Sequence, residues 1–493
     1  MTGAVLVRGT RTLDGAHVDV RLRPGAPLRV AAHLPVTEDD RLVDGTGTTL
    51  LPGLHDHHLH LLALAAARTS VRCGPPDVHG EDGLRAVLAA ASTDATGWVR
   101  GVGYHEDVAG PLDRHRLDAI AGDRPIRIQH TSGALWIVNT VGLRALGLHP
   151  TGEAGPATGG ALPDGVELRA GVPTGRLWRL DRWLRQRSPA APPDLAPVVA
   201  ELLGHGVTGV TDATPDLSAD ARDLLVAEVA SGPTGLRLHL LGADPPGQPG
   251  PPWRSGRVTV GPAKLVLGDH RLPDLDELVT ALARARARPW SGAGPRPVAV
   301  HCVTRVALVL LVTALGEVGV VAGDRVEHGA VVPPELAAHL AGLGAAVVTQ
   351  PGFLAERGDR YLRQVDPADL AHLYPDASLR RAGVTVAVSS DAPYASVDPW
   401  RTIAAAVART APSGHRFGQH EAVTARTALE DHLRPADDLG GPLREVRDGA
   451  PADVCLVAGS PVRTEPRAEG PVLLTAVAGH VVHDRASLRG RGS

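Results

Sequence analysis

Residues 51–60 are Leu51-Pro52-Gly53-Leu54-His55-Asp56-His57-His58-Leu59-His60, and this segment constrains both the architecture and the chemistry of the chain. Four histidines within six residues are difficult to explain by packing alone. Side chains two apart on a strand share a face, so a His-x-His pair can chelate one metal ion. Two such pairs overlap here, His55 with His57 and His58 with His60. One pair can therefore face a metal site while the other faces the opposite side of the strand.

The apolar residues at the start of this segment are the first of eight short predicted strands, most of them followed by a helix-compatible stretch rich in Ala, Leu and Arg. The eight are Leu50–Leu54, Val207–Asp212, Leu236–Leu240, Ala263–Leu267, Val298–His301, Arg325–Glu327, Ala346–Thr349 and Val384–Val388. Strands that alternate with helices pair in parallel, so the sequence predicts an α/β fold, a closed (β/α)8 barrel of TIM type.

Outside these strands, the sequence predicts two further parts. Pro125–Ile128 also resembles a strand, and we assign it to a large insertion at about residues 70–200 of a barrel that spans 49–436. Short apolar runs separated by Gly, Asp and Pro occur at both ends of the chain. We therefore expect residues 1–48 and 437–493 to form one small composite β-sandwich domain.

The composition excludes several classes of function. The 493 residues are 43% hydrophobic, and 54 acidic residues balance 50 basic ones, so we expect no nucleic-acid partner. No apolar run reaches the length of a membrane span, and no signal peptide is apparent. Three scattered cysteines suit a reducing compartment. We expect a cytoplasmic protein that acts on a small molecule.

Lysine occurs once, as Lys264, against 49 arginines. An ε-amine can lose its proton and act as a nucleophile, whereas a guanidinium remains protonated. Taken alone, Lys264 is most simply a remnant of a biased composition. It lies, however, in the fourth predicted strand.

Three more candidate residues lie where predicted strands end: His301, His328 and Asp391. Catalytic groups of a TIM barrel gather at the carboxyl ends of the strands. A single histidine in such a place is usually a packed core residue. Three such sites together with a His-x-His pair favour a metal centre.

The chain resembles the amidohydrolase superfamily over nearly its whole length, and within it the branch that contains N-substituted formamide deformylases. The resemblance rests on Pro52-Gly53-Leu54-x-Asp56-x-His58-x-His60, Arg325-Val326-Glu327-His328 and Ser390-Asp391-Ala392-Pro393. It implies that His58, His60 and Asp391 hold one metal ion, and that His301 and His328 complete the shell of a second. It also implies that Lys264 can be carboxylated by CO2 and bridge the two ions.

The resemblance implies a hydrolase that cleaves a non-peptide C–N bond with a metal-activated hydroxide. Asp391 and Lys264 are the predicted catalytic residues, and Asp391 carries the proton from water to the leaving nitrogen. Zinc is the favoured metal, as one or two ions, with Fe2+, Ni2+, Co2+ or Mn2+ as alternatives. An ester or lactone hydrolase is the second prediction. A catalytically silent barrel that acts as a scaffold is the third, and a homodimer remains open.

The sequence departs from this branch around the expected substrate pocket. His301-Cys302-Val303-Thr304-Arg305 replaces the usual His-x-x-Gly-Asp, Ala134 replaces a usual histidine, and a glutamate usual after Pro173-Thr174-Gly175 is absent. Arg305, Arg179 and Tyr394 are candidates for contacting an anionic substrate. Cys302 faces away from His301 in a strand, so we expect a packed thiol rather than a nucleophile.

Overall fold

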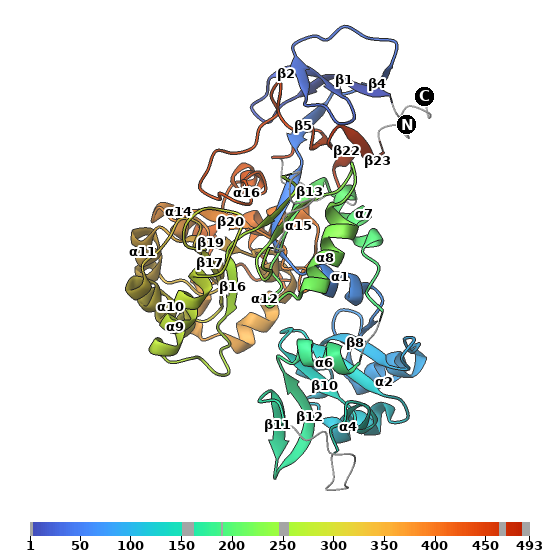
Figure 1. Ribbon diagram of the computed structural model, residues 1–493, viewed down its shortest axis with the longest axis vertical. Helices are drawn as coiled ribbons and strands as arrows, with labels where there is room; N and C mark the ends of the chain where they lie inside the picture. The colour runs from blue at the N-terminus through green and yellow to red at the C-terminus, as the bar shows by residue number, and fades with distance from the viewer. Residues whose placement is uncertain (1–2, 150–161, 189–190, 246–255, 463–469, 486–493) are drawn as a thin grey trace. The chain divides into compact units, whose positions relative to one another are not determined.

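The structure is a computed structural model that describes residues 3–149, 162–188, 191–245, 256–462 and 470–485 (Figure 1). The chain divides into two compact units. Unit 1 comprises Met1–Leu61 and Leu195–Ser493, and unit 2 comprises Leu62–Asp194. The two units are described separately.

Two parallel sheets form the centre of unit 1. The four-stranded sheet has the order β15(Val258–Val260), β14(Arg237–Leu240), β13(Val207–Asp212) and β6(Leu54–Leu59). The five-stranded sheet has the order β16(Ala263–Val266), β17(Val298–Cys302), β18(Arg325–His328), β19(Ala346–Thr349) and β20(Val386–Val388). All neighbouring strands in both sheets run parallel. The predicted α/β class is therefore confirmed.

Backbone hydrogen bonds connect the two parallel sheets at two places. The N–H of Lys264 donates to the carbonyl of Leu241 at 3.1 Å, next to β14. The N–H of Asp391, which follows β20, donates to the carbonyl of His58 on β6 at 2.8 Å. Residues far apart in the sequence are thereby held side by side at the strand ends.

Helices follow most of the parallel strands, as the alternation of the sequence predicts. In unit 1 they are α7(Ala196–Gly204), α8(Ala219–Leu225), the π-helical η1(Val226–Ala230), α9(Leu275–Arg286), α10(Arg305–Val318), α11(Pro334–Leu343), α12(Gly352–Gln364), α13(Pro367–Leu370), α14(Ala377–Arg381), α15(Pro399–Ala408), the 3-10 turn η3(Gln419–Glu421) and α16(Ala425–Asp431). Helices α9, α10 and α11 lie along the outside of the five-stranded sheet (Figure 1).

The apolar residues of β16–β19 and of α9–α11 form one continuous core, which explains why these strands are rich in Val and Ala. Local sequence fixes where the covering helices begin. Asp274 and Glu277 form a capping box at the start of α9, and the Thr304 side chain accepts the N–H of Ala307 at the start of α10. Each such cap stabilises its helix by about 1 kcal/mol.

The first predicted strand, Leu50–Leu54, is wrong in its bounds. Residues Thr48–Pro52 form β5, which pairs antiparallel with β21(Val454–Ala458), and the parallel strand is β6. Gly53 separates the two. A Cβ atom on Gly53 would lie 2.1 Å from the Thr208 Oγ1, so only glycine allows the chain to pass this close to β13.

The fourth predicted strand, Ala263–Leu267, is preceded by the unpredicted strand β15. Gly261 and Pro262 separate β15 from β16 along the chain. The ring of His239 occupies the space where a Cβ of Gly261 would be, 2.0 Å from its Nε2, and proline cannot donate to a strand ladder. The predicted strand therefore matches β16, and the three-residue β15 before it was missed.

Strands from both ends of the chain form a single eight-stranded sheet. Its main order is β23(His480–Asp484), β22(Val472–Val477), β21, β5, β1(Ala4–Arg11), β2(His17–Leu22) and β3(Arg29–Ala31), and β4(Asp40–Asp44) pairs with β1. Apolar residues of both termini share one core on this sheet. The predicted β-sandwich is not confirmed, because the described strands belong to one hydrogen-bonded sheet.

Unit 2 contains a six-stranded mixed sheet. Its order is β11(Val166–Arg169), β12(Val172–Trp178), β10(Leu135–Val138), β9(Ile126–His130), β8(Val99–Tyr104) and β7(Val71–Arg72). Its helices are α2(Gly80–Ala90), α3(Glu106–Ala109), α4(Arg114–Ala121), α5(Thr140–Ala145) and α6(Asp181–Arg187), while α1(Leu61–Arg68) begins at the unit boundary. Pro125–Ile128, which we assigned to the insertion, overlaps β9.

Across the described ranges, no helix combines the length and the apolar character required to cross a lipid bilayer.

Candidate metal centre

The predicted metal ligands meet at the carboxyl ends of the parallel strands of unit 1. One ligand atom from each of His58, His328 and Asp391 lies within 4.8 Å of the other two. Asp391 Oδ1 is 3.6 Å from His58 Nε2 and 3.3 Å from His60 Nε2. The ring centroid of His301 is 4.5 Å from that of His328. Five predicted ligands therefore form one connected cluster.

Lys264, the sixth predicted ligand, is buried on β16. Its Nζ has no hydrogen-bond partner among the described residues. Burial lowers the pKa of Lys264 to about 8, against the opposing charge of Glu327. Its charge in turn lowers the pKa of His58 and of His328.

Two members of the cluster have a strained backbone. His328 has a φ of 73° and Asp391 a φ of 55°, both in the left-handed region that non-glycine residues rarely adopt. Such a conformation costs about 1–3 kcal/mol per residue and persists where the surrounding structure enforces it. Both residues lie after or at the carboxyl ends of strands of the five-stranded sheet, β18 and β20, on the side where the predicted ligands meet.

Hydrogen bonds fix which ring nitrogen of two histidines carries the proton. The Nδ1–H of His58 donates to the Glu327 carboxylate, and the Nδ1–H of His328 donates to the Gln350 side-chain carbonyl at 2.9 Å. Both acceptors lack a proton to give, so each Nε2 retains its lone pair. The Nε2 of His58 is buried without a hydrogen-bond partner among the described residues, as expected of a metal ligand.

The electrostatic surroundings keep the ligands in their metal-binding forms. Burial, reinforced by the charge of Lys264, lowers the pKa of His58 to about 3, so the ring is neutral. Burial alone would raise the pKa of Asp391, but the hydrogen bond from His60 and the neighbouring imidazoles lower it below its usual range. A neutral imidazole and an ionised carboxylate are the forms that bind divalent metals.

Sequence reasoning missed the residues that hold these histidines. Glu327 lies on β18 between the charges of Arg325 and Lys264, which keep its pKa well below the usual range although burial opposes them. Gln350 follows β19, and its amide donates to Ser389 Oγ at 2.9 Å, which orients its carbonyl toward His328. The sequence signal for these two residues was a charged or amide side chain in or next to a strand that is otherwise apolar, because such a group is buried only where it has a partner.

The three predicted substrate-binding residues lie on different elements of the chain. The Tyr394 ring lies edge-on to the His60 ring, with centroids 5.8 Å apart. Arg305 begins α10 and forms an ion pair with Asp369 on α13. Arg179 lies in unit 2, directly after β12. Of the two in unit 1, Tyr394 contacts the cluster directly, through the His60 ring.

Cys302 is a packed thiol, as predicted. It is 1% exposed and belongs to the core beneath α10. Burial raises the pKa of its thiol above the ordinary range, so the reactive thiolate is disfavoured.

Unit 2 contains a second group of histidine and carboxylate side chains, His105, Glu106 and His130, which the sequence did not predict. His130 Nε2 lies 3.0 Å from Glu106 Oε2, and His105 Nε2 lies 3.9 Å from the same oxygen. The Nδ1 of His105 accepts the N–H of Asp107, and that of His130 accepts the N–H of Ser132, both at 3.1 Å. In the neutral rings Nε2 therefore carries the proton, which leaves no lone pair there for a metal.

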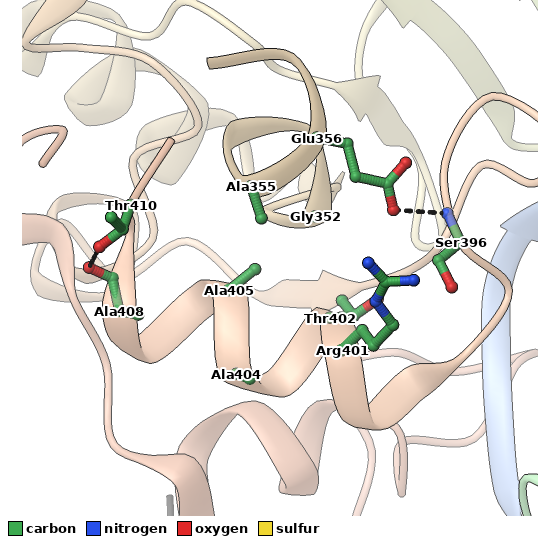
Figure 2. Close-up of a pocket in the computed structure, with 10 residues that line it drawn as sticks. All are labelled: Gly352, Ala355, Glu356, Ser396, Arg401, Thr402, Ala404, Ala405, Ala408 and Thr410. Atoms are coloured by element: carbon green, nitrogen blue, oxygen red, sulfur yellow. Dashed lines mark hydrogen bonds between the residues drawn. The ribbon is translucent and has the colours of Figure 1, made fainter. Parts of the chain in front are cut away.

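A groove of about 230 Å³ separates α12 from α15 (Figure 2). Figure 2 shows alanines along its length and the side chains of Glu356 and Arg401 at one end. Glu356 accepts the N–H of Ser396 at 2.9 Å. None of the candidate metal ligands lines this groove.

Parallel strands that carry histidines and a carboxylate at their carboxyl ends, together with a buried lysine on β16, are an arrangement suited to metal-dependent hydrolysis. The amidohydrolase family model matches residues 41–483, and the chain belongs to the amidohydrolase family. It is an enzyme, a hydrolase that acts on carbon–nitrogen bonds other than peptide bonds.

Individual relatives agree with this membership. The chain is 25% identical to the N-substituted formamide deformylase of Arthrobacter pascens, over 98% of this chain and 95% of that protein. Its fold resembles an uncharacterized metal-dependent hydrolase of Pyrococcus horikoshii OT3 with a TM-score of 0.66 and 17% identity, over 97% and 100% of the two chains. It also resembles the zinc complex of atrazine chlorohydrolase TrzN from Arthrobacter aurescens TC1, with a TM-score of 0.51, 15% identity, and coverage of 98% and 96%.

Proposed function

We propose that this chain cleaves a non-peptide C–N bond, in an amide, an N-acyl compound or a cyclic amide, with the help of bound metal. The observation that carries the proposal is the cluster of five predicted ligands at the carboxyl ends of the parallel strands: His58, His60, His301, His328 and Asp391. The sixth predicted ligand, Lys264, is buried on β16 without a hydrogen-bond partner for its Nζ among the described residues. In this proposal the two parallel sheets are the two halves of one (β/α)8 barrel, in which the consecutive β15 and β16 count as one interrupted strand, and the catalytic groups gather at the carboxyl ends of the strands.

The donor set fits a divalent metal. Imidazole nitrogens with a carboxylate oxygen suit Zn2+, which we take as the resident ion, with Fe2+, Ni2+, Co2+ or Mn2+ as alternatives. The buried lone pair on His58 Nε2 supports a ligand role. Lys264 would hold the second ion as a carbamate, because an arginine at this position could not be carboxylated.

Each residue of the site then has a separate role in the reaction. A bound divalent ion supplies a Lewis acid that lowers the pKa of water and polarises a carbonyl. Asp391 accepts the proton of the attacking water and delivers it to the leaving nitrogen, which departs as an amine. Glu327 and Gln350 keep His58 and His328 in the tautomer with a free Nε2.

Hydrolysis assays with matched substrates test this function. Purified protein supplied with zinc should release amine from simple amides, and Asp391→Asn should lose that activity. Faster cleavage of matched esters or lactones would replace the amide proposal with the esterase alternative. Cleavage of neither, by a protein that holds metal, would favour the scaffold alternative.

The proposal places the enzyme in the cytoplasm with a small-molecule substrate, and it requires neither nucleic acid nor membrane. Light scattering coupled to size-exclusion chromatography would test whether it forms a homodimer.

A further inference from the structure

Arginine and tryptophan side chains pair repeatedly in unit 2. Four of the seven tryptophans of the chain lie in this unit, and each of their rings has at least one guanidinium close to it. The pairs are Trp98 with Arg127, Trp136 with Arg100 and Arg127, Trp178 with Arg176, and Trp183 with Arg187. An aromatic face attracts a guanidinium, but the N–H groups of the cation still need hydrogen-bond acceptors.

Arg176 shows the complete form of this contact. Its guanidinium lies 5.5 Å from the centroid of the Trp178 ring, and its Nε–H donates to Glu167 Oε2 at 3.2 Å. Its Nη1 donates to the carbonyl of Leu112, also at 3.2 Å. For Arg176 the chain itself therefore supplies both the ring and the acceptors.

Arg127 on β9 is held between two tryptophan rings and differs from Arg176 in its hydrogen bonding. Its guanidinium lies 5.6 Å from the centroids of both Trp98 and Trp136, and the residue is only 7% exposed. Its Nε is buried without a hydrogen-bond partner among the described residues. A buried donor without an acceptor is costly, and more so when it carries charge. A guanidinium in this state is a candidate for binding an anion from outside the chain.

A second guanidinium lies beside that of Arg127. Arg100 on β8 pairs in register with Arg127 on β9, so both side chains lie on the same face of the sheet. The Arg100 guanidinium is 5.3 Å from the centroid of the same Trp136 ring. Like charges on neighbouring strands repel each other, and a bound anion would offset that repulsion.

Two acids partly balance these cations. The charges of Asp94 and Asp181 oppose the decrease that burial causes in the pKa of Arg127. Each acid already accepts another hydrogen bond. Asp94 Oδ1 accepts the backbone N–H of Trp98 at 3.0 Å, and Asp181 Oδ1 accepts the Nε1–H of Trp136 at 2.9 Å. The remaining positive charge therefore suits a ligand with a single negative charge.

We propose that Arg127, with Arg100 beside it, forms a binding site in unit 2 for a small carboxylate with a single negative charge. The planar guanidinium of Arg127 donates to the carboxylate oxygens, and Arg100 adds positive charge beside them. Trp98 and Trp136 hold the guanidinium in place. These rings are 5% and 4% exposed, so the site takes a ligand of about the size of acetate. The predicted metal ligands all belong to unit 1, and the proposed site uses none of them.

Acetate binding tests the site. Saturation-transfer NMR follows the acetate methyl group in a titration of the purified, zinc-supplied protein at constant ionic strength, and inorganic phosphate is then added as a competitor. We expect saturable binding, with a Kd that rises about tenfold or more in Arg127→Met, because methionine keeps an apolar stem and removes the charged donors. Phosphate should displace acetate only weakly, since it carries more charge than the site can balance.

Arg127→Lys is the second variant at this position and serves if Arg127→Met does not fold. Lysine keeps the charge but cannot donate two parallel hydrogen bonds, so the Kd for acetate should again rise. An unchanged Kd in the folded variants at Arg127 would overturn the proposal. Displacement of acetate by phosphate at the lower concentration of the two would overturn the carboxylate as the class of ligand.

Arg176→Met is the matched control. It removes a guanidinium that also lies against a tryptophan of unit 2 but has Glu167 as its acceptor, so the Kd for acetate should stay unchanged. A rise equal to that in Arg127→Met would show a general effect of losing an arginine and would overturn the proposal.

The His58→Ala variant separates this site from the metal centre, because acetate can also bind a metal ion. Acetate binding that depends on Arg127 should persist in His58→Ala, whether or not the proposed hydrolase activity is found. Loss of all acetate binding in His58→Ala would assign the acetate to the metal centre and overturn the proposal.

Discussion

The two groups of histidine and carboxylate side chains in the described part of the chain are built in opposite ways. In the cluster around His58 and His328, side-chain oxygens accept the Nδ1–H, so Nε2 is left with a lone pair. In the group of His105 and His130, backbone N–H groups donate to Nδ1, so Nε2 carries the proton and faces Glu106. The same residue types therefore favour a metal centre in one place and, in the other, a purely structural group of His105, Glu106 and His130, which we call the staple. The partner of Nδ1 decides between them.

The largest expected difference between the two groups is in catalysis. His58→Ala should reduce amide hydrolysis by about 1000-fold or more, because it removes a ligand of the ion that activates water. The rate for His130→Ala should remain within about twofold of the wild-type rate, because the ring of His130 only donates a hydrogen bond to Glu106 in the staple. Steady-state kcat/KM on the best amide measures both. Comparable losses in the two variants would mean that unit 2 also contributes to the chemistry.

Lys264 gives the next largest effect. Both Lys264→Ala and Lys264→Arg should lose activity by about 100-fold or more, since neither side chain can form the carbamate that would hold a second ion. Short carboxylic acids such as acetate should partly restore Lys264→Ala. Full activity in either variant would return this lysine to the role of a compositional remnant.

Glu327→Gln tests whether the partner of Nδ1 matters for metal affinity. The amide is a weaker acceptor and can present its NH2 to the ring, so the metal Kd should rise by about 10–100-fold with the ligands all intact. Competition with a chromogenic chelator measures the Kd. Glu106→Gln is the matched change in the staple and should leave the metal Kd unchanged; a shift there would contradict the assignment.

The smallest effect concerns the staple and pH. The hydrogen bond from His130 lowers the pKa of Glu106 to about 2, from an ordinary value of 4.5. The ionised carboxylate therefore stabilises the folded state above about pH 4.5, and this contribution is lost as the pH falls toward 2. Because Glu106 is partly exposed, solvent screening reduces the contribution to about 1 kcal/mol or less. Urea unfolding should show a steeper loss of stability below pH 4.5 in wild type than in Glu106→Gln; parallel curves would contradict this role.

Much of the architecture could be predicted from local pattern. Short apolar strands alternating with helical stretches were enough for the α/β class and for most of the parallel strands. The errors arose where tertiary packing overrides local sequence. The close approach of Gly53 to Thr208 divides one apolar run between two sheets. The strand β15 was missed because its three residues give too short an apolar pattern.

The part of the candidate site that could be predicted consists of residues at the carboxyl ends of strands, where a barrel carries its catalytic groups. The His-x-His pair and the histidines that end strands β17 and β18 could be read from strand order alone. Glu327 and Gln350 could not, because their roles depend on which ring they face across the strands.

Metal analysis of purified protein tests the central claim most directly. We expect mass spectrometry to find at least one transition-metal ion per chain in wild type and in His130→Ala, and much less in His58→Ala and His328→Ala. A wild-type protein that contains no transition metal, and gains none on reconstitution with zinc, would contradict the assignment of this site as a metal centre.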